Sequence, residues 1–138
     1  MILTSNSEKT LPEAFLRRCV FFHIEMPDSD ELCDILLAKK QIFPEITRNQ
    51  VKAFVRLFLK IARTINGKKP ATHELILWVW WMLRQGFTPE DIYTFNAENT
   101  GLSYRNEIIL SGFSILAKET DDLVAVKKAI TANAIKEE

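Results

Sequence analysis

The sequence predicts a mainly α-helical protein, in which a short strand–helix–strand piece precedes a bundle of five to six helices. Apolar residues recur at helical spacing over most of residues 29–130, and helix-capping residues stand before the periodic segments. Two short apolar runs, residues 2–3 and 20–24, instead have the character of buried strands. We therefore divide the chain into residues 1–26, the strand–helix–strand piece, and residues 27–138, a helical domain.

The composition is that of an ordinary folded domain, with 47% hydrophobic and 26% charged residues in a chain of 138. The 18 Lys and Arg residues balance the 18 Asp and Glu residues, so the formal net charge is zero. Proteins that bind nucleic acid through its phosphates usually carry a basic excess, so nucleic acid is disfavoured as a partner. Neutrality also limits repulsion between copies and leaves self-association open.

Several absences bear on location and metal binding. No apolar run reaches the roughly 18 residues that a membrane span requires, and the N-terminus lacks the features of a secretion signal. Cys19 and Cys33 have no CxxC spacing and are expected to be free, buried thiols in a reducing cytosol. Together with His23 and His73 they match no zinc-ligand pattern. We therefore expect a cytoplasmic protein with no membrane contact and no metal site.

Residues 1–26 contain three short elements. The apolar pair at residues 2–3 forms the first strand and leads into small polar residues. A helical turn follows, with Thr10 as the expected N-cap, Pro12 just inside the helix and Glu13 three residues after the cap. Residues 20–24 form the second strand. Because two short strands need neighbours to make a stable sheet, we infer that more sheet precedes them in the natural context.

The helical domain is expected to begin after Pro27, which ends the second strand. Asp28 or Ser29 is the expected cap of its first helix, and Thr47 caps the helix with the clearest apolar stripe. Thr72 is expected to cap the third. The six predicted helices span residues 29–40, 48–65, 72–85, 89 to 93 or 95, 102 or 103 to 118, and 120 to near the end of the chain.

The third of these helices contains nine consecutive apolar residues, Leu75 to Leu83. A helix that is apolar all round is expected to be buried on most sides. Trp78, Trp80 and Trp81 lie within four positions, so they cannot all face one core. We expect at least one of them to lie against another domain or another subunit.

At the N-terminus, a strand ending in Thr4-Ser5-Asn6 is followed by Leu11-Pro12-Glu13-Ala14-Phe15-Leu16-Arg17-Arg18. This order resembles the C-terminal end of the nucleotide-binding core of MoxR-like AAA+ ATPases. The resemblance is close over residues 1–27 and looser over residues 28–85. It implies that Asn6 is the sensor 1 residue, which positions the attacking water. It also implies that Arg18, with Arg17 beside it, is an arginine finger for a neighbouring subunit. A turn asparagine and surface ion-pairing arginines are the alternatives.

The segment Lys69-Pro70-Ala71-Thr72-His73-Glu74-Leu75 opens the third predicted helix. It resembles the start of the lid helix that carries the sensor 2 residue in the same family. The resemblance implies that Lys69 and His73 contact nucleotide phosphates at a helix N-terminus. The family often has arginine where this chain has His73, and a neutral histidine cannot make the bidentate phosphate contact of arginine. A solvated loop lysine and a helix-face histidine are the alternatives.

Two motifs that an ATPase requires do not occur in the sequence. There is no G-x-x-x-x-G-K-[ST] phosphate loop and no hydrophobic strand ending in Asp-Glu to hold magnesium. The four glycines, at positions 67, 86, 101 and 112, cannot build a phosphate cradle. We therefore expect that the isolated chain takes no cofactor and does not hydrolyse ATP, and that ATP and Mg²⁺ belong to a full-length parent.

The favoured hypothesis is that the chain is the C-terminal part of a MoxR-like AAA+ ATPase, from sensor 1 and the finger helix to the helical lid. In the parent it would contribute to ATP hydrolysis and chaperone-like remodelling, with other AAA+ subunits as partners. The alternative is a free-standing helical module for protein interaction or self-association, whose resemblance to AAA+ proteins is ancestral only. A helical DNA-binding domain is a third hypothesis and rests on helix count alone.

Overall fold

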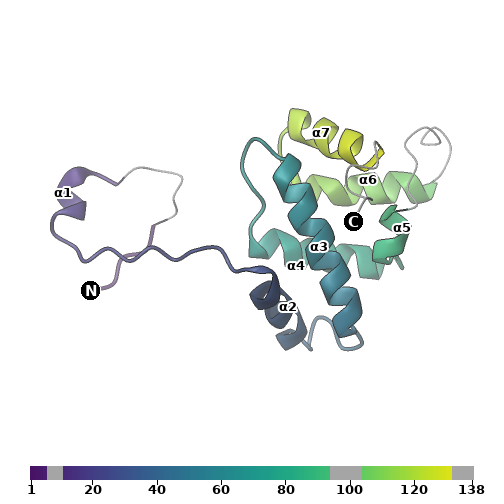
Figure 1. The fold of residues 1–138 in the computed structure, drawn as a ribbon, viewed down its shortest axis with the longest axis horizontal. Helices are drawn as coiled ribbons and strands as arrows, with labels where there is room; N and C mark the ends of the chain where they lie inside the picture. Colours follow the sequence, from purple (N-terminus) through teal and green to yellow (C-terminus); the bar gives the residue numbers. More distant parts are fainter. Residues whose placement is uncertain (6–10, 94–103, 132–138) are drawn as a thin grey trace.

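The chain folds into a group of packed helices from which its N-terminal segment extends (Figure 1). The structure, a computed structural model, describes residues 1–5, 11–93 and 104–131. These ranges contain seven α-helices and no β-strand, which confirms that the protein is mainly helical. We call residues 1–27 the N-terminal arm and residues 28–131 the helical body. The described helices are all too short or too polar to span a bilayer.

The N-terminal arm differs from its prediction. Its only described helix is α1 (Glu13–Leu16), which buries no residue and receives no side-chain cap from Pro12. The two strands predicted at residues 2–3 and 20–24 are absent from the described residues, where these segments are non-helical chain without a partner. A strand exists only through hydrogen bonds to a neighbouring strand, and no described segment supplies one. The predicted cap Thr10 lies outside the described residues.

The helical body begins with α2 (Ser29–Ala38), whose N-cap is Asp28, one of the two predicted caps. The backbone N–H of Glu31 donates to Asp28 Oδ1 (2.9 Å), and the backbone N–H of Asp28 donates to Glu31 Oε2 (3.0 Å). This reciprocal capping box satisfies two N–H groups that have no partner inside the helix. Leu32, Cys33 and Leu36 form the buried side of α2.

The longest helix, α3 (Arg48–Thr64), is capped by Thr47 as predicted and packs against α2, α4, α5 and α7. Its apolar stripe is buried and its opposite side is basic, which is the expected pattern for a helix with one face on a core. The Phe54 ring meets the Trp78 ring of α4 edge-on, with centroids 5.7 Å apart. The buried residues of α3 are Val51, Phe54, Val55, Leu57, Phe58 and Ile61.

Helix α4 (Thr72–Arg84) starts at the predicted residue, but its N-cap differs from the prediction. Its N-cap is Ala71 and not Thr72, because Glu74 reaches back and accepts a hydrogen bond from the Ala71 N–H (3.0 Å). Gly86, with a φ of 77°, follows the helix in the left-handed conformation that glycine adopts without strain. The helix therefore ends where its sequence predicts.

The three tryptophans of α4 face different surroundings, as expected. Trp78 is fully buried in the core, Trp81 is half-buried, and Trp80 is exposed. The Arg84 guanidinium lies over the Trp80 ring, 5.4 Å from its centroid. No described residue accepts a hydrogen bond from the buried indole N–H of Trp78 or Trp81.

Three further helices complete the helical body: α5 (Pro89–Tyr93), α6 (Tyr104–Leu116) and α7 (Thr120–Thr131). The predicted start of α6 at residue 102 or 103 lies outside the described residues. Helix α6 packs along α4, and Gly112 allows this close approach because an added Cβ would lie 3.1 Å from Trp81 Cδ1. Helix α7 packs on both α3 and α6. Together α2–α7 agree with the predicted bundle of five to six helices.

Candidate functional site

Helix α1 presents two of the predicted catalytic residues at its C-terminal end. Arg17 is exposed, and its guanidinium donates to the carboxylate of Glu13 one turn earlier. Such an exposed pair contributes little to stability, because water screens both charges. Arg18 is exposed as well, and its side chain forms no ion pair with a described residue. The third predicted catalytic residue, Asn6, lies outside the described residues.

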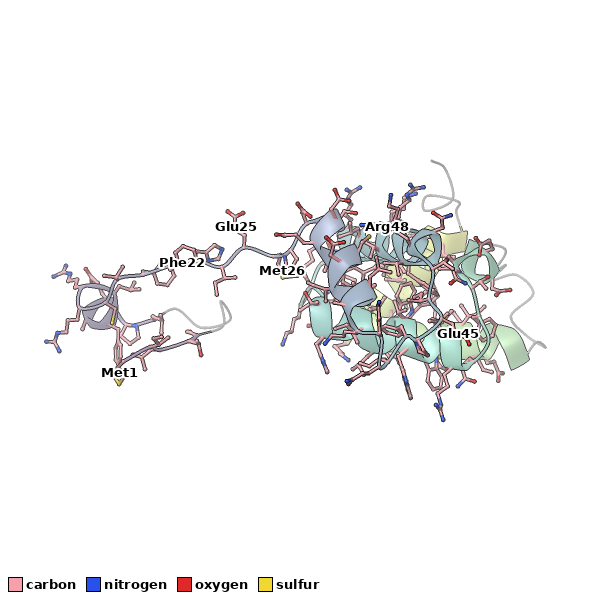
Figure 2. The ribbon with its side chains drawn as sticks, turned by 90° about the horizontal axis from the view of Figure 1, so that it is seen from below. Met1, Phe22, Glu25, Met26, Glu45 and Arg48 are labelled. Carbon is pink, nitrogen blue, oxygen red and sulfur yellow. The ribbon has the colours of Figure 1, made fainter. Side chains whose placement is uncertain are left out.

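The rest of the arm is apolar and uncovered. Ten of the 14 exposed large apolar side chains in the described residues belong to the arm. Val20 is 101% exposed, Phe22 83% and Ile24 81%. Figure 2 shows Phe22, Glu25 and Met26 along the arm between α1 and the helical body. The complete set is Met1, Ile2, Leu3, Phe15, Leu16, Val20, Phe21, Phe22, Ile24 and Met26.

The backbone of the arm is uncovered too. Within the described residues, the N–H groups of residues 19–26 donate no hydrogen bond. An extended segment with apolar side chains and unpaired backbone groups is a template for pairing with another strand. The arm therefore has the chemistry of a strand, although it has no strand partner within the described chain.

The two predicted cofactor-binding residues lie in the helical body. Lys69 is exposed, and its Nζ donates to the backbone carbonyl of Ala62 (2.9 Å) in the last turn of α3. This carbonyl also accepts a long hydrogen bond from the Ile65 N–H (3.4 Å), and the lysine adds a second donor that complements the negative end of the helix dipole. His73 is exposed in the first turn of α4. Lys69 thus has a structural role that the sequence did not indicate.

The described residues do not by themselves form a site that fits ATP and Mg²⁺. Arg17 and Arg18 lie on the arm, apart from Lys69 and His73 in the helical body (Figure 1). No group of three His, Cys, Asp or Glu side chains in the described ranges is placed to hold a metal ion. We therefore derive no chemical step from a nucleotide bound to this chain alone.

The two cysteines are in different environments. Cys33 is buried in α2 as predicted, whereas Cys19 is exposed on the arm, so its predicted burial is wrong because no described segment covers the arm. Burial raises the pKa of the Cys33 thiol, and the negative charge of nearby Asp30 acts in the same direction. Cys33 is therefore an inert core thiol and not a nucleophile.

One buried carboxylate was not predicted as a structural link. Asp122 lies in the first turn of α7, and its side chain is buried against the loop after α3. It accepts hydrogen bonds from the backbone N–H groups of Asn66 (2.9 Å) and Gly67 (3.1 Å). No local sequence pattern connects these positions, which lie more than 50 residues apart.

Comparison with known proteins adds no assignment. No protein-family model matches the chain, and neither a curated protein nor a solved structure is found to be similar to it.

Proposed function

We propose that this chain supplies the end of the nucleotide-binding core and the helical lid of a MoxR-like AAA+ ATPase. The helical body is the lid in this proposal, and the N-terminal arm belongs to the α/β core. The chain does not hydrolyse ATP alone. Together with the rest of the ATPase it contributes to ATP-driven, chaperone-like remodelling, with other AAA+ subunits as its partners.

The observation that carries this proposal is the contrast between the two parts of the chain. The helical body has a continuous core of buried apolar side chains. The arm buries almost none, although it carries ten exposed large apolar residues. Fully burying one such side chain contributes about 1.5–3 kcal/mol, so their exposure is strongly unfavourable. Insertion of the arm into a larger sheet removes this cost and supports the resemblance seen in the sequence.

Within the proposal the predicted site residues have distinct roles. Arg18, which no described carboxylate neutralises, reaches the site of a neighbouring subunit, and Arg17 supports it less directly because it pairs with Glu13. Asn6 positions the attacking water. Lys69 and His73 face the nucleotide from the lid, and Lys69 must leave the Ala62 carbonyl in order to do so.

Reconstitution with a separate phosphate-loop half tests the proposal. This half is a MoxR-like core polypeptide that contains the phosphate loop and the Asp-Glu strand and ends before sensor 1. The mixture is expected to hydrolyse ATP, whereas neither part does so alone. Arg18→Ala should lower turnover at least about a hundredfold, since arginine fingers contribute a factor of about 10³ or more. The matched exposed change Lys40→Ala should leave turnover unchanged. Turnover by this chain alone, or none in an assembly that forms, would contradict the proposal.

The same arm also favours a second function, self-association of a free-standing module. Exposed apolar side chains and unpaired backbone groups can pair with those of another copy. On the outer side of α4, Leu77 and Trp80 are exposed as well and provide a further apolar contact. Light scattering distinguishes the two functions. A stable dimer that is lost in Phe22→Ser/Ile24→Ser favours the module, whereas a monomer that assembles only with the phosphate-loop half favours the ATPase.

A further inference from the structure

The outer side of α3 carries a concentration of positive charge that the proposed ATPase role does not use. The helix contains five basic residues and no acidic one: Arg48, Lys52, Arg56, Lys60 and Arg63. Residues 46–73 as a whole contain seven of the chain's 18 Lys and Arg residues and no Asp or Glu. Because the net charge of the chain is zero, this charge is local and is balanced elsewhere in the molecule.

Four of these residues form one row along the helix, which we call the α3 basic row: Lys52, Arg56, Lys60 and Arg63. Residues three or four positions apart share one side of a helix, so their side chains are neighbours. At 1.5 Å per residue the row is about 17 Å long. Lys52, Arg56 and Arg63 are exposed and Lys60 is half-buried. In Figure 1 α3 lies across the front of the helical body, where a partner can reach it.

Most of this charge is uncompensated within the described residues. The ion pairs described there are Arg17–Glu13 and Arg48–Asp34, so Lys52, Arg56 and Arg63 form none with a described residue. Asp34 pairs with Arg48 (3.1 Å), one turn before Lys52, and Asp30 lies one turn before Asp34 on α2, so both carboxylates lie close to the start of the row. The free positive charge is therefore greatest over Arg56 and Arg63, toward the C-terminal end of α3.

We propose that the α3 basic row docks an acidic α-helix of a partner protein, in which carboxylates recur at every fourth residue. A second helix laid along α3 has the same axial repeat, about 6 Å per four residues, so its carboxylates lie beside successive residues of the row, with Arg56 and Arg63 as the main contacts. Opposite charges in register give specificity and fast association more than high affinity. This interaction does not depend on the ATPase proposal, because it uses residues of the helical body alone.

The surroundings of the row favour a polypeptide over other polyanions. No large apolar side chain of α3 is exposed. Single-stranded nucleic acids stack their bases on aromatic side chains, and surface helices that bind membranes insert apolar ones, so both lack their usual contacts here. Asp30 and Asp34 near the start of the row repel a long polyanion that continues past the helix. A short acidic helix can end before these two carboxylates.

A fluorescence anisotropy titration with the full chain tests this inference. The probe is a labelled alanine-based helical peptide of about 16 residues with Glu at every fourth position, and the control peptide has Gln at those positions. At low salt the chain is expected to bind the Glu peptide and not the Gln peptide. Raising the salt from about 20 to 300 mM should weaken binding at least about tenfold, since the contacts are exposed charge pairs.

Charge-reversed variants locate the contact. Arg56→Glu/Arg63→Glu is expected to weaken binding about tenfold. Lys40→Glu/Lys118→Glu changes the net charge equally at exposed positions outside α3. Its affinity for the Glu peptide should stay within about twofold of that of the unchanged chain. Circular dichroism checks that each variant folds. The neutral pair Arg56→Gln/Arg63→Gln, expected to weaken binding about threefold, serves if the Glu pair does not fold.

Three results would overturn the inference. The first is an absence of binding to the Glu peptide at low salt. The second is an equal loss in the α3 variant and the Lys40/Lys118 variant, which would show an effect of net charge alone. The third is tighter binding of a single-stranded oligonucleotide or of anionic lipid vesicles than of the peptide, which would assign the row to those partners.

Discussion

Replacing Asp122 by alanine is expected to loosen the helical body where α7 meets the loop after α3. The Asp122 side chain is only 4% exposed, and its carboxylate accepts hydrogen bonds from the backbone N–H groups of Asn66 and Gly67. These bonds join segments that are distant in sequence. The substitution therefore removes a tertiary link and not a local helix cap, and it acts on the loop that also carries Lys69.

The size of the effect follows from the number and exposure of these bonds. Hydrogen bonds to a charged acceptor contribute about 1.5–3 kcal/mol each, and two N–H groups lose theirs. Asn66 and Gly67 are exposed, so water can replace part of the carboxylate's role. We therefore expect Asp122→Ala to lower the free energy of unfolding by about 2–3 kcal/mol. Asp122→Asn keeps one acceptor oxygen and should lower the free energy of unfolding by only about 1 kcal/mol.

Urea unfolding followed by far-ultraviolet circular dichroism measures this change. The midpoint should fall with an unchanged slope, because the area exposed on unfolding stays the same. Asp121→Ala is the matched control, because Asp121 is the exposed neighbour in the same turn. This substitution should lower the free energy of unfolding by about 0.5 kcal/mol or less. If the two alanine variants unfold at the same urea concentration, the carboxylate of Asp122 has no stabilising role and the reasoning fails.

Four further outcomes are expected. Gly112→Ala should destabilise the chain by about 1 kcal/mol in urea, because overpacking of the added Cβ, 3.1 Å from Trp81 Cδ1, outweighs the better helix propensity of alanine; a raised midpoint would show that α4 and α6 make room for the methyl group. Iodoacetamide should label exposed Cys19 but not Cys33 at neutral pH, as read by mass spectrometry, and equal labelling would contradict the burial of Cys33. Burial raises the pKa of the Cys33 thiol, so its neutral form is favoured in the folded state. Its contribution to the free energy of unfolding is therefore fully present below the unfolded-state pKa and is lost as pH rises through the folded-state pKa. Phe22→Ser should change the free energy of unfolding of the helical body, measured in urea, by no more than about 0.5 kcal/mol, since this side chain is exposed. A larger loss would mean that the arm packs on the body.

The helices of the body could be predicted because their signals are local. Asp28 and Thr47 each bond to a backbone N–H three residues ahead, and the apolar stripe of α3 is visible in its own sequence. The N-cap of α4 is one residue from its prediction because the local signal favours threonine over alanine at that position. The Glu74 side chain decides between them by bonding to the Ala71 N–H.

The features that sequence reasoning missed depend on partners far along the chain. The strand predicted at residues 20–24 needs a neighbouring strand, and an apolar run cannot show whether one is present. The hydrogen bonds that Asp122 accepts from Asn66 and Gly67 form only when α7 packs beside the loop after α3. For the same reason, motif resemblance predicted which residues belong to the candidate site but not whether this chain brings them together.

Amide hydrogen exchange of residues 19–26 tests whether the arm is a strand that belongs to a larger AAA+ core. Exchange is followed by mass spectrometry in the chain alone and in its mixture with the phosphate-loop half. In the chain alone these amides should exchange as fast as in an unstructured peptide, because they donate no hydrogen bond within the described residues. In the mixture they should become protected by at least about a hundredfold, as expected for a strand inside a sheet. Equally fast exchange in an assembly that has formed, or full protection in the monomeric chain alone, would contradict the proposed origin of the arm.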